Sequence, residues 1–151
     1  MSNYVKKYFT EADIKEIGDS IRAAEENTSG EIRVVIRQQR TWREKKQTLE
    51  NIARAEFLKL GMDKTQHRTG VLILVILRDR QLYILADEGI YSKIDQASWA
   101  VIAQDIVKRF SSNDYRGGIL EGIQRVGNIL AQHFPKQPND VNELPNDVVV
   151  R

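Results

Sequence analysis

The chain has 151 residues, an ordinary hydrophobic content of 41% and a formal net charge of only +2. One domain of this length can bury a sizeable core, and so small a charge argues against non-specific nucleic-acid binding. The chain contains no cysteine, which excludes disulfides, zinc–thiolate centres and cysteine nucleophiles and fits a reducing compartment.

The N-terminal segment has no apolar stretch behind its lysines, so a signal peptide is not expected. The longest apolar run, Val71 to Leu77, is too short to cross a bilayer. We therefore expect a soluble, cytoplasmic protein without a membrane span.

The first part of the chain predicts a helix, a strand and a second helix. A hydroxyl N-cap at Thr10, followed by isoleucines at helical spacing, predicts a helix over 11–26. The β-branched segment 31–36 predicts a short strand. A second helix is predicted over 43–61, with Gly61 at its C-terminus and an apolar face that consists of Leu49, Ile52, Ala53, Phe57 and Leu60.

The middle of the chain predicts a hairpin of two strands. Residues 71–77 are continuously apolar, which is typical of a strand that is buried on both faces. The short polar segment 78–81 predicts a turn, and 82–86 predicts the returning strand. Two further helices are predicted over 96–110 and 114–133.

The predicted elements have the order α-β-α-β-β-α-α. The first two strands and the helix between them form a crossover unit, which is nearly always parallel and right-handed, and the third strand returns antiparallel. We therefore expect an α/β fold, a small three-layer α/β/α sandwich with a mixed central sheet. Residues 1–135 should form one domain, followed by a C-terminal tail over 136–151 that packs on the body or is mobile.

The third predicted strand ends on two adjacent carboxylates, Asp87 and Glu88, followed by Gly89. With Asp95 near the next helix, they offer the hard oxygen ligands that Ca²⁺, Mg²⁺ or Mn²⁺ prefer. A positive φ angle at Gly89 would let the turn cluster its carboxylates. A solvated turn and a plain helix cap explain the same residues, so both interpretations stay open.

The reversal of strand direction determines which loops should meet this acidic turn. The end of the third strand should lie beside the starts of the other two, which places Asp87 near residues 28–31 and 67–69. His67 and Arg68 could then bind phosphate or act in acid–base catalysis near the carboxylates. An exposed loop histidine is the simpler interpretation of His67.

A basic loop, residues 37–46, should leave the opposite edge of the sheet. It holds one acid, Glu44, an indole at Trp42 and five basic side chains, Arg37, Arg40, Arg43, Lys45 and Lys46. Such a loop could bind phosphate or nucleic acid through charge and stacking, or it could simply be solvated. The low net charge argues against nucleic acid as the partner.

Several short motifs occur in the order and spacing of a known family. The segments SGEIRVVI, TGVLILVILRDRQLYILADEGI, WxxI, FxxxDYRxGIxxGI and HFP, which span about residues 5–135, resemble the TPM domain family. The ending is similar to a cytosolic bacterial branch of that family. The resemblance implies a small α/β/α fold, divalent-metal binding and, for some members, acid phosphatase activity.

The resemblance also indicates where this chain differs from the family pattern. The family typically has an acid shortly before the GVL strand, and here the segment HRTG, with Arg68, replaces it. After the third strand this chain has extra carboxylates. The implied ligands of Ca²⁺ or Mg²⁺ are therefore Asp87, Glu88 and Asp95, with Asp63 as a further candidate.

The leading hypothesis is a TPM-type domain that binds a divalent cation and has weak metal-assisted phosphatase activity, with His67 or Arg68 holding the anion. One alternative is a non-enzymatic interaction module whose partner is another protein. A second alternative is a phosphate or nucleic-acid binder that uses the basic loop, residues 37–46.

Overall fold

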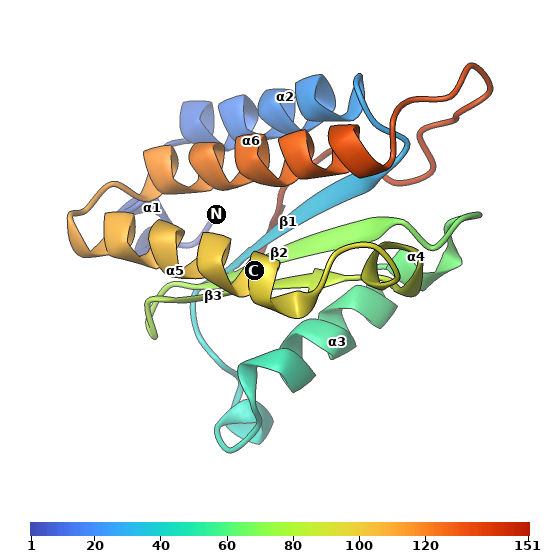
Figure 1. Ribbon diagram of the computed structural model, residues 1–151. Helices are drawn as coiled ribbons and strands as arrows, with labels where there is room; N and C mark the ends of the chain where they lie inside the picture. The colour runs from blue at the N-terminus through green and yellow to red at the C-terminus, as the bar shows by residue number, and fades with distance from the viewer.

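The structure is a computed structural model that describes residues 1–151. Figure 1 shows its helices and strands, with the chain coloured from the N-terminus to the C-terminus. In chain order the elements are α1 Asn3–Lys6, α2 Glu11–Glu25, β1 Glu31–Arg37, the 3₁₀ helix η1 Trp42–Glu44, α3 Leu49–Lys59, the 3₁₀ helix η2 Met62–Lys64, β2 Gly70–Ile76, β3 Gln81–Ala86, α4 Glu88–Tyr91, α5 Gln96–Ser111, α6 Tyr115–His133 and β4 Val149–Val150.

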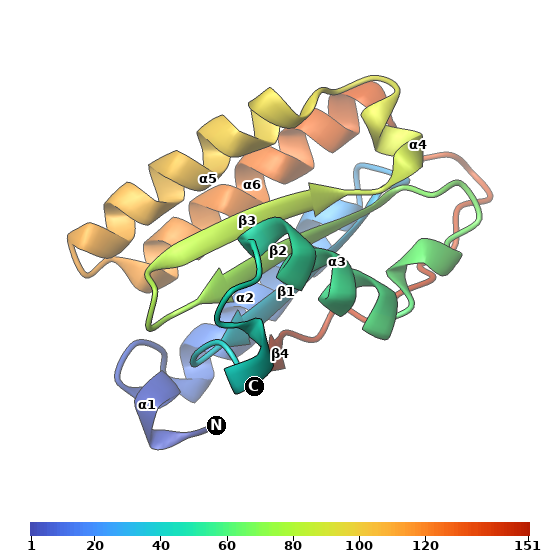
Figure 2. The same cartoon turned by 90° about the horizontal axis from the view of Figure 1, so that it is seen from below.

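The four strands form one mixed sheet in the order β3-β2-β1-β4. Strand β1 runs parallel to β2 and β4, whereas β3 runs antiparallel to β2. Helices α2, α5 and α6 cover one face of the sheet, and α3 covers the other (Figures 1 and 2). The predicted three-layer sandwich, its mixed sheet and the reversal between the second and third strands are therefore confirmed.

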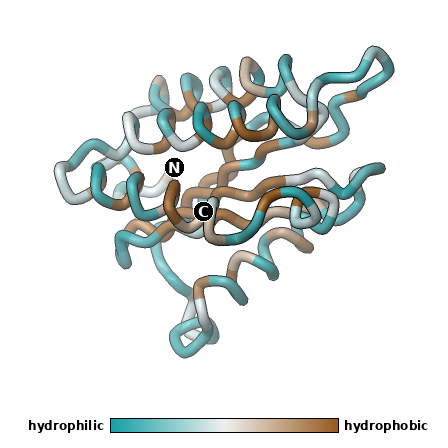
Figure 3. Tube along the Cα trace, in the orientation of Figure 1, coloured by the Kyte–Doolittle hydropathy of each residue, from teal (hydrophilic) through white to brown (hydrophobic).

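Alternation along β1 divides the hydrophobic core between the two faces of the sheet. Ile32, Val34 and Ile36 pack beneath α2, α5 and α6, and Val35 points to the smaller cluster beneath α3. Neighbouring side chains of a strand point to opposite faces, so one short strand serves both cores. Figure 3 shows that hydrophobic residues concentrate in the strands and on the inner sides of the helices.

The C-terminal tail packs on the body of the domain. The Leu144 side chain is only 9% exposed, and its backbone N–H donates to Oε1 of Glu31 at 2.8 Å. Further along, Val149 and Val150 pair with β1 as the fourth strand of the sheet. The tail therefore covers the edge of β1 that the other strands leave open, as one of the two alternatives expected.

The helix predicted over 43–61 is wrong in its first part. Glu44 accepts the backbone N–H of Thr41 at 2.8 Å and pairs with Arg37, which holds residues 42–44 as a separate 3₁₀ turn. Helix α3 begins only after Thr48, whose hydroxyl caps its first turn. A helix N-cap with its own side-chain acceptor starts a new helix rather than continuing the preceding turn.

Candidate functional site

The acidic turn lies where β3 ends and α4 begins. Asp87 is the N-cap of α4, and its Oδ1 accepts the backbone N–H of Glu88 at 2.7 Å. The Asp87 N–H in turn donates to the carbonyl of Gly70 at 2.9 Å. These bonds fix Asp87 beside the start of β2, with its side chain only 4% exposed.

Arg68 binds Asp87 through two hydrogen bonds. The Nε–Oδ2 distance is 2.8 Å and the Nη2–Oδ1 distance is 2.9 Å. Hydrogen bonding to Asp87 raises the pKa of Arg68, and the nearby charges of Glu88 and Asp63 act in the same direction. Glu88 lies 3.9 Å from Nη1 of Arg68. One guanidinium therefore pairs with two carboxylates, those of Asp87 and Glu88.

Gly89 is needed for close packing, and the positive φ expected there is wrong, because Gly61 is the only glycine with a positive φ. The Gly89 N–H donates to the carbonyl of Arg68 at 2.9 Å. A Cβ at this position would lie 2.2 Å from the carbonyl oxygen of His67 and 2.6 Å from that of Arg68. The absence of a side chain thus lets α4 rest directly on the loop before β2.

These residues border a cavity of about 180 Å³ that is lined by residues of α3, α4 and the end of β3. Its lining divides by chemistry into two sets of residues. We call the charged residues, Arg54, Asp63, Arg68, Asp87 and Glu88, the charged half, and the remaining residues, Phe57, Leu58, Leu85, Ala86 and Tyr91, the apolar half. The structure therefore brings three of the four predicted metal ligands together with Arg68.

The remaining predicted residues do not line this cavity. Asp95 is the N-cap of α5, and its Oδ1 accepts the Ser98 N–H at 3.1 Å. His67 is exposed on the loop before β2. Glu31 lies at the same end of the sheet, but β2 separates its strand from β3, so it is two strands away from Asp87. No three histidine, aspartate or glutamate side chains lie close enough together to hold a metal ion by themselves.

The basic loop is partly neutralised from within. The Arg37 side chain is buried and donates to Oε2 of Glu44 at 3.0 Å, which lowers the pKa of Glu44 to about 2. Arg40 donates from Nε to Oδ2 of Asp79 at 2.7 Å. Trp42, in contrast, is 80% exposed. Two of the five basic side chains therefore serve the fold, which leaves less charge for a phosphate or a nucleic acid.

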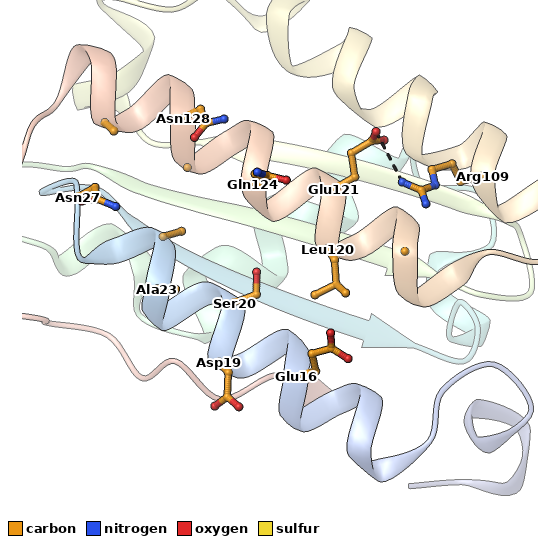
Figure 4. Close-up of a pocket in the computed structure, with 14 residues that line it drawn as sticks. Glu16, Asp19, Ser20, Ala23, Asn27, Arg109, Leu120, Glu121, Gln124 and Asn128 are labelled. Carbon is orange, nitrogen blue, oxygen red and sulfur yellow. Dashed lines mark ion pairs between the residues drawn. The ribbon is translucent and has the colours of Figure 1, made fainter.

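A larger groove of about 860 Å³ lies between α2 and α6 (Figure 4). Gly127 lets the two helices approach closely, since a Cβ at this position would lie only 2.9 Å from that of Ala24. The acids along the groove are paired, as Figure 4 shows for Glu121, which lies 3.6 Å from Arg109. None of the predicted site residues lines this groove.

Sequence reasoning missed the α3 side of the cavity, Arg54 and Leu58, and also Tyr91 on α4. Arg54 and Leu58 are four residues apart and so lie on one face of the helix. The apolar face predicted for this helix consisted of Leu49, Ile52, Ala53, Phe57 and Leu60, which left Leu58 pointing outward. A large apolar residue on the polar face was the available signal.

The fold and the cavity define the class of the protein: a small α/β/α sandwich with a charged cavity at the end of its antiparallel edge strand. A family model described as the TPM domain matches residues 3–129. The chain therefore belongs to the TPM domain family, as the motifs predicted. No curated protein matches the chain.

Solved structures that resemble the chain include three bacterial proteins. The solution structure of the BA42 protein from the psychrophilic bacterium Bizionia argentinensis is 32% identical, with 99% of this chain and 100% of that one covered and a TM-score of 0.86. An N-terminal domain from P. gingivalis is 19% identical, with 84% and 79% covered and a TM-score of 0.69. An N-terminal domain from Corynebacterium glutamicum is 14% identical, with 89% and 81% covered and a TM-score of 0.56. The last two likenesses concern the fold alone.

None of the helices combines the length and the apolar character that a bilayer crossing requires.

Proposed function

We propose that the protein binds a divalent cation, Ca²⁺ or Mg²⁺, in the charged half of the cavity. The observation that carries this proposal is the position of the Arg68 guanidinium against the carboxylates of Asp87 and Glu88, in a cavity that Asp63 also lines. A guanidinium in that position acts as a bound cation would, because it neutralises oxygen ligands that would otherwise repel one another. Carboxylate oxygens are also the ligands that these cations prefer.

Cation binding at this point requires an exchange with Arg68. The Asp87 side chain is 4% exposed and also holds the first turn of α4, so it stays in place. The Arg68 side chain is 42% exposed and can turn toward solvent. The cation then replaces the guanidinium, with Asp87 and Glu88 as ligands and water completing the shell. Because the cation competes with a tethered charge, we expect a dissociation constant of about 10⁻⁴–10⁻³ M.

An NMR titration of the full chain with CaCl₂ and with MgCl₂ tests this proposal. We expect amide shifts in residues 63–69 and 87–91. Arg68→Ala should bind the cation more tightly than the wild type, because the internal competitor is gone. Arg80→Ala is the matched control, since Arg80 also has a positive φ, of 49°, but lies in the distant β2–β3 turn.

A second pair of variants tests whether the carboxylates of the cavity bind the cation. Glu88→Gln should weaken cation binding, whereas Glu26→Gln, at an exposed acid outside the cavity, should not. Absence of shifts at roughly 10 mM cation, well above the range of weak calcium modules, would refute the proposal. Equal cation affinities in wild type, Arg68→Ala and Glu88→Gln would also contradict it.

Phosphate-ester hydrolysis is a second function that we propose for the same cavity, and it rests on the first. Arg54 also lines the charged half, so release of Arg68 by a cation would leave two guanidinium groups for a phosphoryl group bound there. A bound cation supplies activation of a phosphoryl oxygen and of water. His67, exposed nearby in sequence, is the proposed acid or base.

Hydrolysis of p-nitrophenyl phosphate with added Mg²⁺ tests this second function. We expect activity that Asp87→Asn abolishes and that His67→Gln lowers. Activity that is equal in wild type and Asp87→Asn would assign the hydrolysis to a contaminant and remove the proposal, while the cation titration would keep its own outcome.

A further inference from the structure

We propose that the apolar half of the cavity is a docking site for a segment of another protein. The segment would insert one large apolar side chain and carry a lysine or arginine beside it. This docking goes beyond the proposed cation binding and does not require the cation.

The exposed apolar residues at the cavity are the first observation. Leu58 is 61% exposed and Tyr91 is 39% exposed, although both are large and apolar. A single exposed leucine is ordinary on a protein surface. These two residues, however, line one cavity together with the buried side chains of Phe57 and Leu85, which belong to the core beneath α3. An exposed apolar patch joined to a pocket is typical of an interaction site.

The size of the cavity indicates what enters it. Its volume of about 180 Å³ suits one leucine or aromatic side chain, because a cavity of about 150 Å³ is enough to bind benzene. Anchor residues of this kind, inserted into a pocket and surrounded by polar contacts, account for most of the affinity in many protein interfaces.

The charge around the cavity indicates which kind of residue should lie beside the apolar anchor in the partner segment. The charged half holds three carboxylates and two guanidinium groups, which leaves an excess of one negative charge. Arg68 neutralises the buried Asp87. The Glu88 side chain, in contrast, is 80% exposed, and its carboxylate has only one long contact of 3.9 Å with Arg68. A lysine or arginine beside the anchor would find Glu88 available, which favours a basic segment over an acidic one.

The walls of the cavity are held in place before any partner binds. Helix α4 rests on the loop before β2 through the close contact at Gly89. The Tyr91 hydroxyl donates to Oε1 of Gln96 at 3.0 Å, which ties α4 to the start of α5. A pocket that is already formed costs the partner little ordering, so a short segment can bind it.

Selection of short random peptides on the full chain tests the proposal, with EDTA present so that cation binding plays no part. We expect the enriched peptides to share one Leu, Phe or Trp with a Lys or Arg beside it. A selected peptide should bind Leu58→Glu roughly tenfold more weakly or worse, because the anchor loses its apolar wall. Val101→Glu, at a residue on α5 that is 54% exposed and outside the cavity, should leave binding unchanged.

Charge reversal gives a second readout that a folding defect would not imitate. On Glu88→Lys, selection should enrich acidic residues beside the same apolar anchor. Failure to enrich any peptide, enrichment without an apolar anchor, or equal binding to wild type and Leu58→Glu would each overturn the proposal. If analytical ultracentrifugation found a dimer of the wild type that Leu58→Glu abolishes, the occupant would be a second copy of the chain. That result would overturn the proposal that a basic segment of another protein docks here. A failed cation titration would leave this result untouched.

Discussion

Arg68 and Asp87 join the start of β2 to the end of β3 through two parallel hydrogen bonds of 2.8 and 2.9 Å. The two partners differ in exposure, since the Asp87 side chain is 4% exposed and that of Arg68 is 42% exposed. Removing the arginine therefore leaves a buried charge without its partner, whereas the reverse change leaves an arginine that water can solvate.

The first prediction concerns the stability of this pair. Arg68→Ala should lower the urea midpoint of unfolding, and added CaCl₂ should restore it, because the cation replaces the lost positive charge. Chemical unfolding followed by far-UV circular dichroism measures both effects. Arg80→Ala changes another arginine with a positive φ. It should lower the urea midpoint less than Arg68→Ala does, and CaCl₂ should not raise its midpoint. Loss without rescue would mean that Asp87 serves only the fold.

The second prediction compares two glycines. Gly89→Ala should destabilise the protein by about 2 kcal/mol or more, because its Cβ would meet two backbone carbonyls, and backbone atoms cannot turn away. Gly18→Ala in α2 should instead stabilise the protein by about 1 kcal/mol through helix propensity. The nearest atom to a Cβ at Gly18 is 3.7 Å away, an ordinary contact. Thermal unfolding of the two variants should therefore move in opposite directions.

The third prediction concerns pH. Burial raises the pKa of Glu25 from 4.5 to about 7, against the opposing effect of the hydrogen bond that its carboxylate accepts from Ile32. Between these two values the folded protein holds a proton that the unfolded chain has lost. Stability should therefore fall as the pH rises from about 4.5 to about 7, by at most about 3 kcal/mol, and then level off.

Urea unfolding at several pH values measures this dependence. Glu25→Gln should reduce the slope within that window, and some slope should remain because burial also raises the pKa of Glu31. Glu26→Gln, at the exposed neighbouring acid, should keep the wild-type curve. An unchanged slope in Glu25→Gln would show that Glu25 ionises normally in the folded state.

The fourth prediction concerns the docked tail. Leu144→Ala should cost about 2 kcal/mol of stability, because Leu144 is 9% exposed and packs in the core beneath α3. Val141→Ala changes a tail residue that is 74% exposed and should stay within about 0.5 kcal/mol of the wild type. Equal effects of the two changes would mean that the tail contributes no specific packing in solution.

The long elements could be predicted from the sequence because their signals are local. Thr10 and Asp13 form the two reciprocal bonds of a capping box, at 3.0 and 2.9 Å, and the apolar period of α2 follows directly. The reversal at β3 followed from a turn too short for a crossover. These rules also placed Asp87 beside Arg68, which is the central contact of the candidate site.

The details of the site could not be predicted, since they depend on non-local packing. Helix α4 has four residues, too few to give a periodic pattern. Arg68 has a φ of 56°, which few residues other than glycine adopt, and nothing in the sequence marks it. Gly89 was expected to provide a turn. A glycine is needed there instead because a Cβ would collide with backbone carbonyls of a loop about twenty positions earlier in the chain.

The pairing of β4 with β1 has a consequence for how the molecule folds. Val35 and Val149 lie side by side in the sheet although 114 positions separate them along the chain. Closing so long a loop costs entropy that a ladder of two residues recovers only after its template has formed. Strand β4 should therefore pair with β1 late in folding, after the rest of the domain has formed. Substitutions that weaken this pairing should speed unfolding and leave the refolding rate nearly unchanged.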